Sequence, residues 1–118
     1  MSLIDSPLLK QLQSYLDVTA TRQSLIAANM ANIDTPGYQT RDLNFQQALT
    51  DAQAGLNPGN AEHLVGGLLA RPDGNNVNID RESTLMAQTQ LQYDTGVALL
   101  RDEFHRIDLA ITGGSSLP

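Results

Sequence analysis

The triplet Asp94-Thr95-Gly96 is the most enzyme-like pattern in the chain, because Asp-Thr-Gly is the active-site triplet of aspartic proteases. In a dimer of that class, two carboxylates share a proton and activate water. The mechanism needs a β-rich fold that holds the triplet in a tight loop. Here the flanking Tyr93 and Val97 are consecutive positions of an apolar helical repeat. We therefore expect Asp94 and Thr95 to face solvent or a neighbour, and Gly96 to permit a close helix contact.

The two histidines do not indicate a metal site. His63 and His105 are far apart in the sequence, and no third ligand stands at motif spacing. His105, beside Arg106, is typical of the last turns of a helix, where a cation complements the helix dipole. The chain has no cysteine, which excludes disulfides and thiolate metal sites. The sequence therefore predicts no catalytic site, no metal or other cofactor and no small-molecule substrate.

Charge and hydropathy argue against two further kinds of partner. The formal net charge is −6, Lys10 is the single lysine, and the arginines are scattered, whereas nucleic-acid binding needs a basic patch. No apolar run approaches the roughly 20 residues that span a bilayer. Residues 1–5 lack the basic start and apolar core of a cleaved signal peptide. We expect any export to follow another route.

The N-terminal third predicts a long helix. Ser6 can cap its first amides, and Pro7 suits the first helical position, where a missing N–H does no harm. A seam at alternating three- and four-residue steps follows, as in a heptad repeat. Its members are Leu9, Leu12, Leu16, Thr19, Gln23, Ile26, Met30 and Ile33.

A turn signal ends this first helix. Thr35-Pro36-Gly37-Tyr38 places Pro and Gly at the central positions of a type II turn. Pro36 also moves Thr35 away from helical dihedrals. The last helical residue is expected to be Asn32 or Ile33.

A second seam fills the C-terminal third. Asn78 or Asp80 is the expected cap, and Gly113-Gly114-Ser115-Ser116 is expected to end the helix, with Gly113 in the left-handed closing position. The seam consists of Met86, Gln90, Tyr93, Val97, Leu100, Phe104, Ile107 and Ile111. Three arginines of this helix, Arg81, Arg101 and Arg106, stand among acidic residues. They form a solvated face, or set register with a neighbouring subunit.

The segment between the seams is rich in Gly, Asn, Pro and Asp. One short helical patch, around Phe45 and Ala48, is introduced by Asp42 or Asn44. Turn signals on both sides of residues 60–70 leave little room for a packed unit. We expect an irregular segment with one short helix.

The fold is therefore predicted to be mainly α. The N- and C-terminal helices pair as a coiled-coil-like hairpin around the irregular middle segment, and the whole chain, 1–118, is one unit. Its parts are an N-terminal helix (1–33), the middle segment (34–79), a C-terminal helix (80–112) and a tail (113–118). Four apolar residues lie off the seams and would be covered by other subunits. They are Tyr15, Leu25, Leu91 and Leu99.

The end of the first helix contains more amide side chains than are needed to end a helix. Asn29 lies several residues inside the helix, where its propensity is poor, so we expect it to hydrogen-bond a partner. The residues from Ala28 to Tyr38 resemble the N-terminal signature of the flagellar rod and hook family, an Ala-Asn, Ala-Asn, Thr-Pro-Gly-Tyr series. They are Ala28, Asn29, Ala31, Asn32, Thr35, Pro36, Gly37 and Tyr38.

Further matches resemble the proximal rod members of that family. One is Arg41-Asp42-Leu43-Asn44-Phe45, and another runs from Asp73 to Glu82. The resemblance covers about 22–114 and is weak over 55–70. The matched positions outside the first signature are Asp73, Gly74, Asn75, Val77, Tyr93 and Gly96.

The resemblance implies a structural subunit that polymerises through its terminal helices into the rod that crosses the periplasm. Implied partners are copies of itself, other flagellar rod proteins, the MS ring or its adaptor FliE, and the flagellar type III export apparatus. Export would need no cleaved signal peptide. Two alternatives stay open: another axial rod subunit, and a cytosolic helical-hairpin adaptor or export chaperone.

Overall fold

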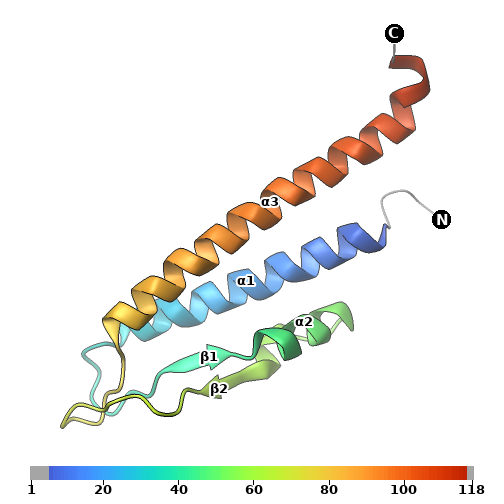
Figure 1. The fold of residues 1–118 in the computed structure, drawn as a ribbon. Helices are drawn as coiled ribbons and strands as arrows, with labels where there is room; N and C mark the ends of the chain where they lie inside the picture. Colours follow the sequence, from blue (N-terminus) through green and yellow to red (C-terminus); the bar gives the residue numbers. More distant parts are fainter. Residues whose placement is uncertain (1–5, 117–118) are drawn as a thin grey trace.

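A computed structural model, which describes residues 6–116, is mainly helical and has the predicted pair of long terminal helices. Figure 1 shows α1 lying between α3 on one side and a small unit of α2 and two strands on the other. The terminal helices run antiparallel, and the molecule is 69 Å long. Its elements are α1 (Pro7–Ala31), β1 (Arg41–Leu43), α2 (Phe45–Gln53), the 3-10 helix η2 (Pro58–Ala61), β2 (Glu62–Leu64) and α3 (Ile79–Ser116).

Helix α1 begins and ends with the chemistry that the sequence indicates. The Ser6 hydroxyl accepts a hydrogen bond from the Leu9 amide at 3.0 Å, with Pro7 as the first helical residue. The helix ends at Ala31, one or two residues earlier than the expected Asn32 or Ile33, because Asn32 already leaves helical dihedrals. The type II turn is confirmed: the Tyr38 amide donates to the Thr35 carbonyl, and Gly37 has φ +76°.

Helix α3 begins where expected but ends later than expected. The Asn78 side chain accepts from the Arg81 amide at 3.0 Å, so Asn78 rather than Asp80 is the cap. The predicted end at Gly113 is wrong, since the helix continues to Ser116. Glycine lowers helix propensity by about 1 kcal/mol but keeps its amide, so it does not by itself end a helix. Residues 1–5 of the predicted first helix and 117–118 of the predicted tail lie outside the described residues.

The α3 side of the helix pair contains small and polar residues that the apolar pattern missed. Glu82 and Thr89 are fully buried, and Gly96 lies against Tyr15 and Leu16 of α1. One heptad further on, Glu103 accepts a hydrogen bond from Ser6 at 3.4 Å. The expected seam was therefore partly wrong. Three of its members are exposed instead: Gln90, Phe104 and Ile111.

The middle segment is more ordered than expected. Strands β1 and β2 pair antiparallel, with Arg41 opposite Leu64, and the Asn44 side chain caps α2 by accepting from the Gln47 amide at 3.0 Å. This unit packs on α1 around a core of Val18, Leu43, Ala48 and Ala61. Sequence patterns missed the strands because each has only three residues.

The packed middle segment contacts two of the four residues that were expected to be covered by other subunits. The Tyr15 and Phe45 rings meet edge to face with centroids 5.7 Å apart, and Leu25 packs against the same core. Both side chains are therefore partly covered within the chain itself, although Tyr15 still lines an open groove. Leu91 and Leu99 are 69% and 51% exposed, so their contacts with other subunits stay a prediction.

We predict that Gly96→Val weakens the helix pair. A Cβ atom at Gly96 would lie 2.8 Å from Leu16 Cδ2 and 3.2 Å from the Tyr15 ring, so the Leu16 and Tyr15 side chains must move to admit the larger side chain. Overpacking of this kind costs about 2 kcal/mol. Urea unfolding followed by far-UV circular dichroism measures the loss. Ala98→Val, on the exposed side of α3, should lower the free energy of unfolding by about 0.5 kcal/mol or less. Equal losses of free energy in the two variants would refute the close contact at Gly96.

Candidate functional site: an assembly surface and the polar network behind it

The structure gathers most of the signature residues at one end of the molecule. The α1 terminus, its type II turn and the loop before α3 meet there (Figure 1). Tyr93 and Gly96 lie elsewhere, along α3, with Tyr93 half-buried and Gly96 buried. The gathered residues are Ala28, Asn29, Ala31, Asn32, Thr35, Pro36, Gly37, Tyr38, Asp73, Gly74, Asn75 and Val77.

Asn75 joins the loop to the turn. Its buried side chain donates to the carbonyls of Asn32 at 2.9 Å and Thr35 at 2.8 Å, and it accepts from the Val77 amide at 2.9 Å. The two segments also touch at Gly74, where an added Cβ would lie 3.4 Å from Gly37 Cα. The end of α1 is thus closed by an amide from 43 residues further along the chain.

Asn29 hydrogen-bonds within its own chain, contrary to the expectation of a partner. Its amide nitrogen donates to the Arg41 carbonyl at 2.8 Å and to Glu82 at 3.2 Å. Its oxygen accepts from the Tyr38 hydroxyl at 2.9 Å and from the Arg41 amide at 3.1 Å. Because the side chain is fully buried, it holds α1, the turn, β1 and α3 together from the inside.

Two arginines and two carboxylates extend this network. Arg22 on α1 makes two hydrogen bonds of 2.9 Å to Asp42 on β1. Arg81 on α3 contacts the same carboxylate at 3.2 Å and Glu82 at 2.7 Å. The formal charges cancel, which buried ion pairs require. Arg81 was expected on a solvated face or at a subunit contact, and it instead lies half-buried within the network.

The pKa of Asp42 reflects this environment. Burial by itself raises the pKa, but hydrogen bonds from Arg22 and the Leu43 amide, with the charges of Arg22 and Arg81, outweigh burial and hold the pKa below its ordinary value. The Asp42 carboxylate therefore stays charged in the folded protein. Sequence reasoning treated Asp42 only as a possible helix cap or part of a motif, because its partners are distant in sequence.

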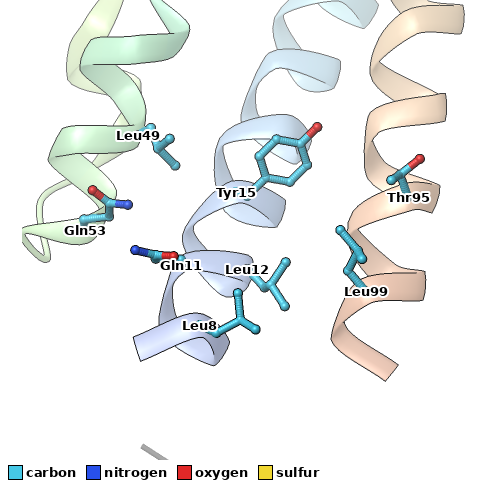
Figure 2. Close-up of a pocket in the computed structure, with 8 residues that line it drawn as sticks. All are labelled: Leu8, Gln11, Leu12, Tyr15, Leu49, Gln53, Thr95 and Leu99. Carbon is cyan, nitrogen blue, oxygen red and sulfur yellow. The ribbon is translucent and has the colours of Figure 1, made fainter. Parts of the chain in front are cut away.

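An apolar groove lies near the other end of the helix pair. We call it the N-terminal groove; it encloses about 370 Å³ between α1, α2 and α3. Figure 2 shows Leu12 and Leu99 pointing into it from facing helices. Its lining residues are Leu8, Gln11, Leu12, Tyr15, Leu49, Gln53, Thr95 and Leu99.

The protease-like triplet lies within α3 and not in a loop. Asp94 is exposed and accepts a hydrogen bond from Gln90 at 3.0 Å. Among residues 6–116, no group of three or more histidine or acidic side chains is placed to hold a metal ion. Within that range, too, no helix is both long and apolar enough to cross a membrane.

Comparison with known proteins identifies similar chains. The sequence model of the family described as "Flagella basal body rod protein" matches residues 9–39. The chain is 35% identical to the flagellar basal body rod protein FlgB of Escherichia coli strain K12, over 75% of this chain and 80% of that protein. It is 30% identical to FlgB of Salmonella typhimurium strain LT2 (87% and 91% covered) and 29% identical to FlgB of Bacillus subtilis strain 168 (90% and 94% covered).

We predict that Asp42→Asn destabilises the fold in a pH-dependent way. Because the folded pKa is lowered, the charged carboxylate stabilises the protein fully above its unfolded pKa of about 3.9, and this contribution is lost as the pH falls through the lower folded value. Breaking the buried pairs should cost about 3 kcal/mol at pH 7. Urea unfolding between pH 7 and pH 3 measures the difference in the free energy of unfolding between the variant and the parent, which we call the gap.

The gap should narrow at acidic pH. Asp34→Asn removes an exposed carboxylate of the turn and should change the free energy of unfolding by less than about 0.5 kcal/mol at pH 7. A gap for Asp42→Asn that stays constant down to pH 3 would contradict the role assigned to its charge.

Proposed function

The chain belongs to the FlgB family of flagellar basal body rod proteins, and on that premise we propose that it is a non-enzymatic structural subunit of the proximal rod. The subunit polymerises through its terminal helices into the rod. This proposal rests on apolar surface that one copy leaves uncovered on its helix pair. The N-terminal groove and the exposed side chains of Leu91 and Leu99 supply that surface.

The polar network has a supporting role in this proposal. It holds α1 and α3 together at the signature end and so limits how far the helices can move apart at the groove. Most signature residues then affect assembly indirectly, because they hold the turn and the loop of their own subunit in place. Six signature positions are exposed and available for direct contact with a neighbour: Ala28, Ala31, Thr35, Pro36, Gly37 and Asp73.

The further partners and the route follow from the family resemblance. We propose contacts with copies of this chain, with other rod proteins, and with the MS ring or its adaptor FliE. We propose that the flagellar type III export apparatus delivers the subunit to the periplasm without cleavage of a signal peptide. A different axial subunit would share this route, whereas an adaptor or chaperone would stay in the cytosol.

The first test of the function is deletion of the gene in its bacterium. Cells should lose flagella, because no rod forms on the membrane ring, and a plasmid copy should restore them. Electron microscopy of isolated basal bodies measures the result. Normal flagella after deletion, or a protein found only in the cytosol of complemented cells, would reject the rod subunit and favour the helical adaptor.

A second prediction concerns the groove. Leu99→Asp should block rod assembly, because a carboxylate in an apolar contact loses its hydration without a partner. The helix content by circular dichroism should change little, since Leu99 is 51% exposed in the single chain. Leu69→Asp is the matched control, since Leu69 is 94% exposed in the loop after β2. Unimpaired motility with Leu99→Asp would contradict this role of the groove.

A further inference from the structure

Helix α3 extends past the start of α1 (Figure 1). Ser6, the cap of α1, donates a hydrogen bond to Glu103 at 3.4 Å, and α3 continues from there to Ser116. We call residues 104–116 the α3 extension; it is about 20 Å long at 1.5 Å per residue. Ile107 continues the face that pairs with α1, because it stands 18 residues after the buried Thr89, which is about five helical turns.

Ile107 is buried although it lies beyond the start of α1. It is 8% exposed and stands one helical turn past Glu103. The neighbours of a residue within the α3 extension do not bury its side chain by themselves, because Phe104 is 47% exposed and Ile111 is 62% exposed. Ile107 is covered in a single chain, so its cover comes from the same molecule and not from a neighbouring copy.

The register of the antiparallel helix pair identifies the part of the chain that lies opposite Ile107. Gly96 lies against Leu16, and each step forward along α3 is a step back along α1. Ile107 stands 11 residues after Gly96, and 11 residues before Leu16 is position 5, which precedes α1. The segment at this level is therefore residues 1–5, which precede the described part of the chain. We call this segment the leader.

The backbone at Ser6 determines which leader side chain reaches Ile107. Ser6 is extended (φ −62°, ψ 141°), and its hydroxyl points at α3, since it bonds to Glu103. In an extended chain, residues two apart share a face and lie about 6.6 Å apart. In a helix, residues four apart lie about 6 Å apart along the axis. A chain that stays extended before Ser6 therefore places Ile4 level with Ile107 and turns Leu3 away.

We propose that the leader lies extended along the α3 extension and that Ile4 covers Ile107. The two β-branched side chains remove apolar surface from water when they pack together, and this burial drives the contact. The inference concerns a contact within one chain and does not depend on the proposed function.

The contact limits where other subunits can meet the α3 extension. Ile4 closes the face at Ile107, whereas Phe104 and Ile111 stay exposed on one flank. Leu109 is 41% exposed and, at 100° per residue, lies about 160° around the α3 axis from Ile107. A neighbour therefore meets the extension at its flank or its far side and does not insert between the leader and α3.

Disulfide formation within one chain tests the contact. Because the chain has no cysteine, the purified full chain carrying Ile4→Cys and Ile107→Cys has a single pair of thiols. After mild oxidation we expect an intrachain disulfide: the protein stays monomeric in non-reducing gel electrophoresis, and mass spectrometry finds neither thiol free for alkylation. Leu3→Cys with Ile107→Cys is the matched control. It should form the bond several-fold more slowly, because Leu3 faces away from α3.

Two results would overturn the proposal. Equal rates of disulfide formation for the two pairs would contradict the extended leader that turns Ile4 toward α3. Disulfide dimers in place of the intrachain bond would show that a neighbouring copy, and not the leader, lies over Ile107.

A double-mutant cycle provides a second, independent test. Ile4→Ala and Ile107→Ala should each lower the Tm of the full chain. Together they should lower it by less than the sum of the two shifts, because both changes remove the same contact. Leu3→Ala is the control and should lower the Tm less than Ile4→Ala does. Shifts that add up fully, or an equal shift for Leu3→Ala, would refute the contact between Ile4 and Ile107.

Discussion

The burial of Asn29 is the constraint on which the rest of the structure depends. A fully buried amide must have its donors and its acceptor satisfied, because leaving them unpaired costs about 1–3 kcal/mol for each group. The partners come from the turn, from β1 and from α3, so the amide is satisfied only when all three segments are in place. The long connection between the helices is thereby fixed to the helices that it connects.

The same constraint explains why polar and small residues lie between the helices. Glu82 can be fully buried because Arg81 and Asn29 bind it, and its place at the start of α3 sets the register of the pair. Seven and fourteen residues later, Thr89 and Gly96 follow at the same face, small enough for the helices to approach closely. The close approach needs a missing side chain at Gly96, and an apolar pattern does not record this.

Hydrogen bonds between residues close in the sequence were predictable, and those between distant residues were not. Ser6, Asn44, Asn78 and the turn at Pro36 act within four residues of their partners, and the structure has them as expected. The pairs Arg22 with Asp42 and Asn75 with Asn32 join residues 20 and 43 positions apart, and no local pattern indicates them. The seam of α3 was partly misassigned for a different reason: apolar residues were counted, whereas Glu82 and Thr89 are buried polar ones.

Most of the long-range polar bonds gather at one end of the helix pair, and the groove lies near the other, where the bond between Ser6 and Glu103 joins the two helices. The signature end is therefore held by more polar bonds than the groove end, and a small rotation about the Asn29 region moves the far ends of the helices most. A rotation that leaves the hydrogen bonds of Asn29 unstrained still changes the width between Leu12 and Leu99. Neighbouring copies of one sequence can thus differ slightly in the angle between their two long helices while keeping the same polar network.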